Sequence, residues 1–401
     1  MAKTESKSHL IRDKLAYMAI IITVYLLGRG IPLYGIDISA YKDTYSNAEN
    51  LLMQTIGGDA NRYSLFALGI SPCMISSILI QIGAACRTAE ARARLSPKRM
   101  NRMQVALTLF FALFQAVLRV RDLRFRVAEN MLLLAEIIAA AEMVTGVLLL
   151  LWMAGRNKKY GLGGQTILIY INIVDRMMST LLRFDIKALL VPLGISAAAM
   201  VVTLIMEGGE KRIAVQRISI YNVYADKNYL AIKLNPAGVM PVMFSSAFFT
   251  LLKLIAVGLH WLFPKNLSIA WWQDNLVLTT IPGIWVYILL IYFLTIGFSM
   301  IMIGPGNIAE QFLKGGDSIR NIHAGRDTRR YLMKHIMIIG FFSATVMSIC
   351  LGCPLFLQLK DGINGELAML PSSVMMMTSL WCNLNQEFLT LKSFEAYQPF
   401  I

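Results

Sequence analysis

Ten apolar stretches recur along the chain and constrain its fold more than any other feature of the sequence. Each is close to the roughly 20 residues that a helix needs to cross a bilayer. Hydrophobic residues make up 56% of the chain and charged residues only 15%, which excludes a soluble core as the organising principle. We therefore predict an all-α polytopic membrane protein with ten transmembrane helices. The stretches are 15–31, 64–83, 103–118, 131–154, 166–182, 188–206, 239–262, 281–303, 335–354 and 367–384.

The charges between these stretches predict how the chain lies in the membrane. If residues 1–14 are inside, the inside segments hold more than twice as many lysines and arginines as the outside segments. By the positive-inside rule, both termini are then expected in the cytosol. One outside loop disagrees, because LRVRDLRFR at 118–126 carries four arginines where few are expected.

Three inside loops, 84–103, 207–238 and 304–334, are long enough to be more than connectors. Residues 207–238 place two glycines at a turn and then alternate polar and apolar residues, which predicts a hairpin that projects into the cytosol. Residues 304–334 combine a helical piece, GNIAEQFLKGG, with a basic cluster. This mixed composition suits a soluble protein partner better than a small solute.

A segment too short to cross the membrane precedes the second apolar stretch. Residues 50–61 are modestly apolar and are interrupted by Gly57, Gly58 and Asp59. Non-helical backbone at membrane depth is tolerated only where it is buried in protein or lines a water-filled cavity. We therefore predict a re-entrant segment or stopper inside a pore.

The sequence contains no recognised catalytic or cofactor-binding motif. GLGGQT at 161–166 lacks the Gly-Lys-Ser/Thr ending of a phosphate-binding loop, and the four histidines are scattered. No nucleophile, base or metal cluster converges in the sequence. We expect no enzyme activity, no catalytic residue, no cofactor and no metal site, so that the energy for transport comes from another protein.

Five motifs in order and in register resemble the SecY channel of the general protein-secretion pathway. They are SLFALGISPCMISSILIQI, GLGGQTILIYINI, EGGEKRIAV, KLNPAGVMPVMFSS and GNIAEQFLKGG, and the similarity covers 11–396. The resemblance implies two pseudo-symmetric five-helix halves around an hourglass pore that also opens sideways to lipid. It implies a first half at 1–186, with helices 1–5 and a plug at about 50–61. The second half is then 187–401, with helices 6–10 and the cytosolic loops 207–238 and 304–334.

Departures from the usual family pattern point to a subtype. The loop after helix 8 has His323-Ala324-Gly325 where the family usually has Arg-Pro-Gly, and the outside loops are short. The chain is similar in this to the accessory SecY proteins of streptococci and staphylococci, which export serine-rich glycosylated adhesins. We therefore expect a protein-conducting channel of the accessory Sec system in the plasma membrane of a Gram-positive bacterium. A housekeeping-type SecY channel is the alternative.

The resemblance also implies partners. A SecA-type motor ATPase would drive the export of unfolded polypeptide, and small SecE/SecG-like or accessory Sec subunits would accompany the channel. Membrane lipid is a further partner, and the basic cytosolic surface leaves the ribosome open as another.

A narrow ring of flexible apolar side chains can pass a polypeptide and exclude water when it is empty. Methionine is more deformable than isoleucine, so we hypothesise a soft ring suited to a bulky or glycosylated substrate. A threonine in the ring would weaken the exclusion of water, and ordinary apolar packing is the alternative for each position. The residues that match the family's ring are Ile70, Met74, Ile169, Ile173, Met243 and Thr378, with Met377 as an alternative on helix 10.

The remaining functional residues are implied by the same resemblance. Helices 2 and 3 would face helices 7 and 8 across a lateral gate, where Pro72 and Pro241, placed inside spans, would permit kinks. Gly57 and Gly58 would give the plug a hinge. The implied plug residues are Leu51, Leu52, Ile56, Gly57 and Gly58.

The implied motor-docking residues are basic and lie on the inside loops 207–238 and 304–334. His323, in place of the usual arginine, favours an accessory motor over the housekeeping one. The docking candidates are Lys211, Arg212, Arg217, Arg320, His323, Arg326, Arg329 and Arg330.

An ion-coupled secondary transporter is the alternative from another class. Half-helices and repeated halves also build solute sites at the midplane of the membrane. Glu136, Glu142 and Lys253 are ionisable groups in apolar stretches, and such groups are functional candidates. They lie away from the broken helix, where a coupled site is expected, which favours the protein channel.

Overall fold

The structure is a computed structural model that describes residues 10–37, 63–85, 96–121, 123–217, 228–263, 266–319, 321–361 and 365–397. The predicted plug at 50–61, with Leu51, Leu52, Ile56, Gly57 and Gly58, lies outside the described residues, as does Arg320.

Helices account for most of the described chain, and each predicted apolar stretch contains or overlaps one of the ten main helices. The long helices are α1 (Leu10–Arg29), α3 (Ser71–Ala85), α5 (Pro97–Val120), α6 (Leu132–Tyr160), α7 (Thr166–Arg183), α8 (Ile186–Gly208), α9 (Met240–Leu262), α11 (Ile281–Ile303), α13 (Arg326–Asp361) and α15 (Leu370–Tyr397). Shorter elements are η2 (Glu129–Met131), α10 (Leu267–Asn275), α12 (Pro305–Gly315) and α14 (Gly365–Ala368).

Within the described residues, six helical segments are long and apolar enough to cross a membrane. They lie on α5, α6, α8, α9, α11 (continuing into α12) and α13, and α3 gives a shorter apolar helix. Large apolar side chains lie exposed on the outer faces of these helices, such as Leu190, Phe293 and Phe342. Exposed apolar surface of this extent marks contact with lipid or protein, so the chain is a multi-pass helical membrane protein.

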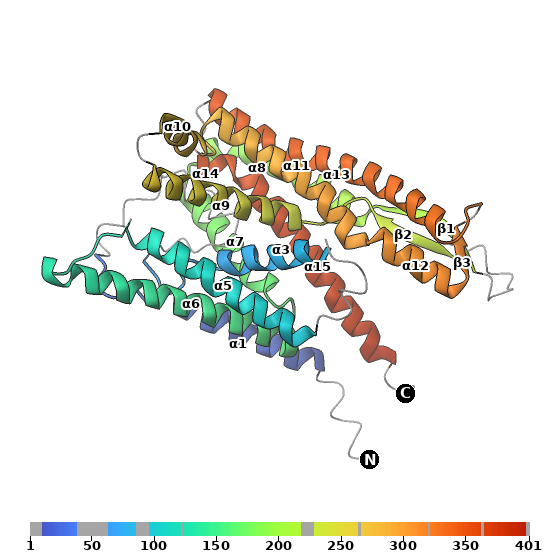
Figure 1. Cartoon of the computed structure of the whole chain (residues 1–401), viewed down its shortest axis with the longest axis horizontal. Coiled ribbons are helices and arrows are strands. Elements are labelled where there is room, and N and C mark those ends of the chain that lie inside the picture. Colours follow the sequence, from blue (N-terminus) through green and yellow to red (C-terminus); the bar gives the residue numbers. More distant parts are fainter. Residues whose placement is uncertain are drawn as a thin grey trace, which may run out of the picture.

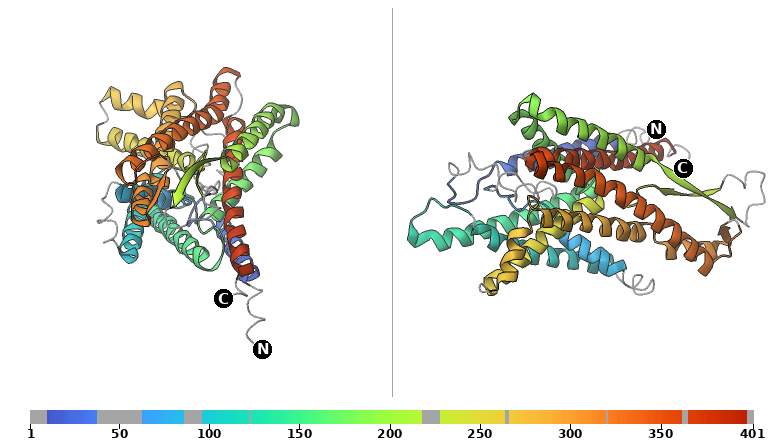
Figure 2. Two further views of the ribbon diagram at one scale, coloured as in Figure 1. Left: turned by 90° about the vertical axis from the view of Figure 1, so that its right-hand side faces the viewer. Right: turned by 90° about the horizontal axis from the view of Figure 1, so that it is seen from above.

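The helices run broadly side by side, with a small sheet at one end of the bundle and α10 at the other (Figure 1). α1 begins and α15 ends toward the end that carries the sheet. α11 packs along α13 and α8 packs along α15, while α5 packs against both α3 and α6. Seen from above, the sheet and the start of α13 extend beyond the ends of the other long helices (Figure 2, right).

The second apolar stretch does not become helical at residue 64. Residues 64–70 form a buried turn with Gly69 at φ +58°, and α3 begins only at Ser71. The polar backbone of this turn is satisfied inside the protein, because the N–H of Leu65 donates to the oxygen of Ile31 at 2.9 Å. The turn shortens the helix that follows it.

The prediction that Pro72 and Pro241 lie inside membrane spans and kink them there is wrong. Both prolines lie in the first turn of their helices, α3 and α9. At that position the missing N–H has no helical partner to lose, so proline starts a helix and does not bend it. Among the described helices, Pro192 in α8 and Pro354 in α13 are the prolines inside a helix.

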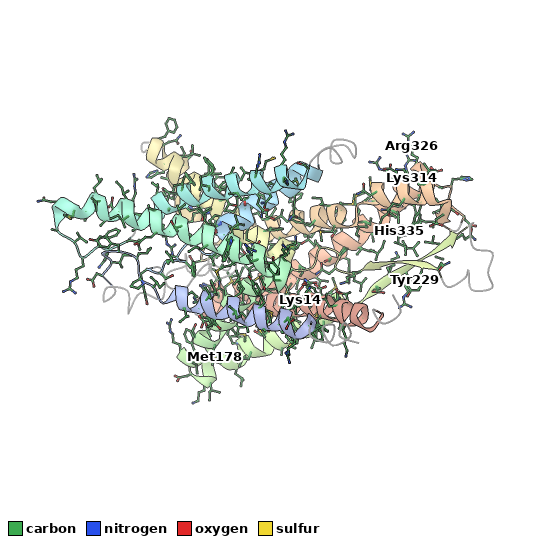
Figure 3. The ribbon with its side chains drawn as sticks, turned by 90° about the horizontal axis from the view of Figure 1, so that it is seen from below. Lys14, Met178, Tyr229, Lys314, Arg326 and His335 are labelled. Atoms are coloured by element: carbon green, nitrogen blue, oxygen red, sulfur yellow. The ribbon has the colours of Figure 1, made fainter. Side chains whose placement is uncertain are left out.

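The predicted hairpin is confirmed, and a third strand joins it. β1 (Glu210–Arg217) pairs antiparallel with β2 (Tyr229–Lys233), with Ala214 opposite Tyr229. β3 (Asp317–Ile319), from the loop 304–334, pairs with the other edge of β1 and gives the order β2-β1-β3. These two loops therefore form one structure, and Figure 3 shows Tyr229, Lys314 and Arg326 at the same end of the molecule.

The basic loop after α5 is paired with the segment that follows α1. Ile36 and Phe125 form a β-bridge, and the N–H of Arg126 donates to the oxygen of Gly35 at 2.8 Å. The N–H of Asp37 donates to the oxygen of Arg124 at 3.1 Å. Two of the four arginines that depart from the positive-inside pattern, Arg124 and Arg126, thus lie on a pairing between two loops, while Arg119 and Arg121 lie at the end of α5.

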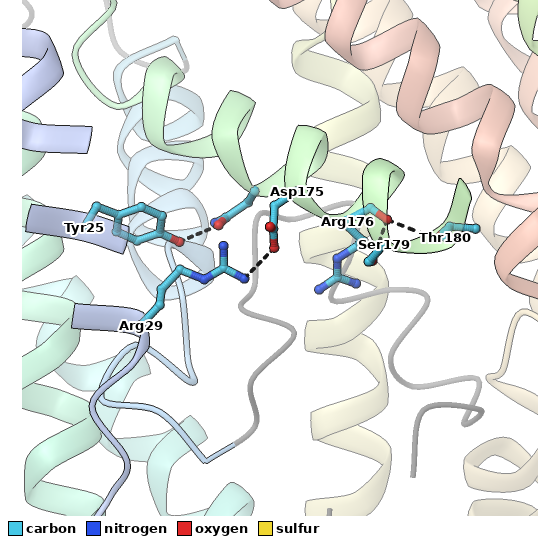
Figure 4. A network of polar contacts seen from close by, with 7 residues as sticks. Tyr25, Arg29, Asp175, Arg176, Ser179 and Thr180 are labelled. Carbon is cyan, nitrogen blue, oxygen red and sulfur yellow. Dashed lines mark hydrogen bonds and ion pairs between the residues drawn. The ribbon is translucent and has the colours of Figure 1, made fainter. Parts of the chain in front are cut away.

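A polar network fastens α1 to α7 (Figure 4). The buried Tyr25 hydroxyl donates to the Asn172 side chain, and the Arg29 guanidinium pairs with Asp175 at 3.0 Å. Arg29 is only 8% exposed, so this pair is partly protected from water. Because Asn172 and Asp175 lie one turn apart, the two contacts fix both the distance and the rotation of α1 against α7.

Gly146 allows α6 to pass against the buried turn at 64–70. A Cβ atom at this position would overlap the carbonyl oxygen of Leu65, whereas a Cβ at Gly155 of the same helix would meet nothing within 4 Å. We predict that Gly146→Ala destabilises the protein by about 2 kcal/mol or more, the range of overpacked buried sites.

Thermal unfolding of the purified protein in detergent measures this effect. Gly155→Ala is the matched control, since removing a glycine from a helix interior favours the helix by about 1 kcal/mol. An unfolding temperature of Gly146→Ala equal to that of the wild type would contradict the close approach of α6 and the turn.

Candidate functional site

The predicted ring residues come from four separate parts of the chain and are all buried. The five apolar members belong to one buried cluster, and Met377 packs against it. Burial in a common cluster is required both of a closed ring and of ordinary packing, so the ring remains a prediction. Their exposed fractions are 2% for Ile70, 4% for Met74, 2% for Ile169, 2% for Ile173, 3% for Met243 and 8% for Thr378.

Local contacts position two of these side chains. The N–H of Met74 donates to the oxygen of Ile70 at 3.0 Å, so Ile70, just before α3, is in register with the helix. The Sδ of Met74 lies 3.2 Å from Nε2 of Gln165, at the start of α7. The contact links α3 to the helix that carries Ile169 and Ile173.

The hydroxyl of Thr378, the one polar group among the predicted ring residues, forms a hydrogen bond within its own helix. Its Oγ1 donates to the oxygen of Val374 in the previous turn of α15, at 2.8 Å. A hydroxyl bonded within its own helix is less able to hold water in the pore. Thr378 would therefore weaken the exclusion of water less than a free hydroxyl.

Hydroxyl groups join the helices on each side of the predicted lateral gate. Ser71 donates to Oε1 of Gln115 at 3.0 Å, and Ser76 bonds Thr108 at 2.6 Å, which ties α3 to α5. Across the gate, Ser246 and Tyr287 are 3.3 Å apart and tie α9 to α11. Each of these bonds joins helices on the same side, while α3 and α9 pack against each other where the sides meet.

A buried carboxylate fixes the first end of the hairpin. Glu207 lies at the end of α8 and is 4% exposed, and its Oε1 accepts a hydrogen bond from Ser379 of α15 at 2.6 Å. The bond joins α8 to α15 three residues before β1 begins at Glu210. Sequence reasoning placed Glu207 in the EGGEKRIAV motif but assigned it no role; its position at the end of an apolar stretch was the available signal.

A buried amide fixes the second end of the hairpin. Asn235 is 1% exposed, and its Oδ1 accepts from Ser343 of α13 at 3.0 Å, while its Nδ2 donates to the oxygen of Gly238 at 3.1 Å. Gly238 has φ +59°, which favours glycine in the turn that leads into α9. The hairpin therefore joins the bundle at two fixed points.

The far end of α15 contacts both the hairpin and the loop between α6 and α7. Glu387 accepts from the N–H of Gly163 at 3.1 Å, and Gln386 accepts from the Lys233 ammonium at 2.9 Å. The loop itself is a structural turn, since the Asn157 side chain donates to the oxygens of Leu162 and Gly164 at 2.7 and 2.9 Å. These contacts hold β2, the loop between α6 and α7 and the end of α15 together.

The predicted docking residues lie on the sheet and at the start of α13. Arg212 is exposed on β1, with its guanidinium 4.7 Å from the centre of the Tyr229 ring, and Arg217 pairs through its backbone with Asp317. Thr328 donates to the oxygen of His323 at 2.8 Å and holds that residue at the helix start. We name as the basic docking surface the exposed side chains of Lys211, Arg212, His323, Arg326, Arg329 and Arg330.

The acidic residues that favoured a transporter have a different setting. Oε2 of Glu142 accepts from the backbone N–H of Tyr34 at 2.9 Å and so holds the segment after α1 against α6. Glu136 lies nearer the start of the same helix. Among the described residues, no group of three or more His, Cys, Asp or Glu side chains could hold a metal ion.

Sequence comparison relates the chain to a family along most of its length. The SecY family model matches residues 64–381. The accessory Sec system protein translocase subunit SecY2 of Leuconostoc gelidum is 26% identical over 410 residues, covering 97% of this chain and 96% of that protein. The protein of the same description from Streptococcus agalactiae is 28% identical over 398 residues, covering 98% and 96%.

Solved structures share the fold. A chain from "The structure of a protein conducting channel" superposes with a TM-score of 0.68 at 15% identity, covering 96% of this chain and 93% of that one. A chain from "Sec61 in the Canine ribosome-channel complex from the endoplasmic reticulum" gives 0.61 at 15% identity, with the same coverage. The fold is therefore that of the SecY/Sec61 channels. Because the family model matches residues 64–381, the chain belongs to the SecY family of protein-conducting channels, which are channels and not enzymes.

Proposed function

We propose that the chain is the channel subunit of an accessory Sec system, which passes unfolded, serine-rich and glycosylated protein across a Gram-positive plasma membrane. The observation that carries this proposal is the similarity to accessory SecY2 proteins over nearly the whole length of both chains. A housekeeping-type SecY channel is the second candidate, and the His323-Ala324-Gly325 loop favours the accessory type. The energy would come from a separate SecA-type ATPase.

Helix packing supports ten spans in two halves, 1–186 and 187–401. Helices α1, α3, α5, α6 and α7 pack among themselves, as do α8, α9, α11, α13 and α15, while α3 meets α9 and α7 meets α15 between the groups. α7 ends at Arg183 and α8 begins at Ile186, so the covalent link between the halves is very short. A hinge at this link would separate α3 from α9 on the opposite side and open a lateral gate.

A closed ring at the waist would keep ions out while the pore is empty. The five apolar candidates are buried together, and the Thr378 hydroxyl is bonded within its own helix. Methionine at positions 74 and 243 would let the ring yield to a substrate of variable width. The plug at 50–61, with the glycine hinge, would close the pore below this ring.

The basic docking surface is the proposed contact for the motor. It lies on β1 and at the start of α13, at the end of the molecule that carries the sheet, and the hairpin joins α9 through Asn235 and Gly238. A motor that moves the sheet would thus act directly on a gate helix. The ribosome is the alternative occupant, since similar structures include ribosome complexes.

The arrangement of the ends supports an orientation with both termini in the cytosol. α1 begins and α15 ends toward the end that carries the sheet (Figure 1). If the sheet meets a cytosolic motor, both of these helix ends face the cytosol. Small SecE/SecG-like or accessory subunits would cover part of the exposed apolar surface beside lipid.

Crosslinking and purification of the channel from its own membrane tests the subtype. We expect an accessory motor and a glycosylated serine-rich protein to be recovered with it. Recovery of the housekeeping motor alone, with general secretory proteins, would overturn the accessory assignment and leave the channel assignment intact.

We predict that Arg212→Glu lowers motor-driven export about tenfold. Reversing this charge is expected to cost about 1.4 kcal/mol of binding free energy between motor and channel, which is a tenfold loss of affinity. Export into inverted vesicles with purified motor measures the effect, and immunoblotting confirms unchanged channel abundance. Lys187→Glu, an exposed basic residue at the opposite end, is the matched control. Normal export by Arg212→Glu would remove this residue from the docking surface.

We predict that changing Met74 and Met243 together to Ile slows export of glycosylated substrate more than export of its unmodified form, because isoleucine is stiffer. The ratio of the two export rates is the measurement. Met178→Ile, at a half-exposed position on α7, is the control. Equal slowing of both substrates would reject the soft ring.

We predict that Glu136→Gln and Glu142→Gln leave export nearly unchanged. Glutamine keeps the oxygen that accepts from Tyr34, and a protein channel needs no proton at these positions. Export assayed with and without a pH gradient distinguishes the two classes. Complete loss of transport in both variants would favour an ion-coupled transporter.

A further inference from the structure

A pair of tryptophans lies at the end of the bundle opposite the sheet, on the short helix between α9 and α11. Trp271 and Trp272 of α10 are 53% and 52% exposed, although they are among the largest apolar side chains in the protein. Their rings are nearly perpendicular, with centres 6.1 Å apart. The channel mechanism proposed above makes no use of them.

The helix that carries the pair is capped and sits at the edge of this end of the bundle. Asn266 caps its start by accepting from the N–H of Ser268 at 3.2 Å, and the Asn275 side chain donates to the oxygen of Trp271 at 2.9 Å. α10 packs against α9 and α11, and it projects sideways from the bundle (Figures 1 and 2). The two rings are therefore held in place by a short, capped helix.

The neighbouring helix ends fix the depth of the pair. α9 ends at Leu262 and α11 begins at Ile281, so both membrane spans terminate beside α10. Phe263, Ile281 and Trp285 are each 59% exposed around these ends. Tryptophan is enriched where hydrocarbon gives way to headgroups, because its ring is apolar and its N–H is polar.

We propose that Trp271 and Trp272 insert into the membrane at the boundary between headgroups and hydrocarbon, at the level where α9 ends and α11 begins. The pair would thereby anchor these two helix ends in lipid. The exposed side chains of this region are mixed: Phe263, Ile281 and Trp285 are apolar, while Ser268 and Asp274 are polar. Such a mixture suits the boundary between hydrocarbon and headgroups. A sugar-binding platform would instead present one flat ring with hydrogen-bonding groups, and the perpendicular rings of this pair do not form such a face. The inference depends on the membrane topology and is independent of the transported substrate.

Fluorescence quenching in lipid nanodiscs tests the proposal. Lipids brominated near the headgroup should quench the emission that is lost in Trp271→Phe/Trp272→Phe more strongly than lipids brominated near the chain end. Iodide in the buffer should quench that emission weakly. Trp381→Phe, which removes another half-exposed tryptophan from a different helix, is the matched control.

Three results would overturn the proposal. Stronger quenching by the deep bromines would place the pair in the hydrocarbon core, and quenching by iodide alone would place it in water. A spectral shift on addition of N-acetylglucosamine oligosaccharide, without quenching by brominated lipid, would indicate a glycan site. The single variants Trp271→Phe and Trp272→Phe give the same readout if the double variant does not fold.

Discussion

A backbone amide inside a bilayer has no water to bond, and the rest of this structure depends on that constraint. It explains why the apolar stretches are helical and why the non-helical segment at 64–70 is buried. There, the N–H of Leu33 donates to the oxygen of Tyr63 at 2.8 Å and that of Leu65 to Ile31 at 2.9 Å. The chain can thus place irregular backbone beside the predicted ring only because two loops satisfy each other's polar groups.

Buried polar side chains have a complementary role, because each one fastens two helices at a chosen place. Tyr25 and Asn172 join α1 to α7, while Glu207 and Ser379 join α8 to α15. Each bond lies within one of the two proposed halves. Where α3 meets α9, the hydroxyl bonds join α3 to α5 and α9 to α11, which is a suitable arrangement for the proposed lateral gate. Firm halves with a weaker contact between them are what a lateral gate requires.

Much of the fold was predictable from residues alone, because hydrophobic length and charge asymmetry are local properties. The hairpin at 207–238 and the helix GNIAEQFLKGG followed from their patterns in the same way. The start of α3 was not predictable, since residues 64–70 are as apolar as the helix that follows, and the choice between turn and helix depended on contacts with Ile31 and Gly146. Hydropathy does not distinguish apolar residues that pack as a turn from those that form a helix. The error in placing Pro72 arose from this. Pro241 was already the third residue of the predicted stretch 239–262, which α9 matches closely, so its place in the first turn could be read from the sequence.

The sequence by itself determined that this chain is a helical membrane protein, and its motifs in register indicated a SecY-type channel. Only the tertiary structure decided that β3 joins the hairpin, because strand pairing between loops a hundred residues apart leaves no trace in a three-residue strand. It also gave Glu207, Asn235 and Glu142 their partners, since a lone polar residue in an apolar context does not reveal which distant group will satisfy it. Composition decides which segments enter the membrane, and three-dimensional packing decides which polar groups meet there.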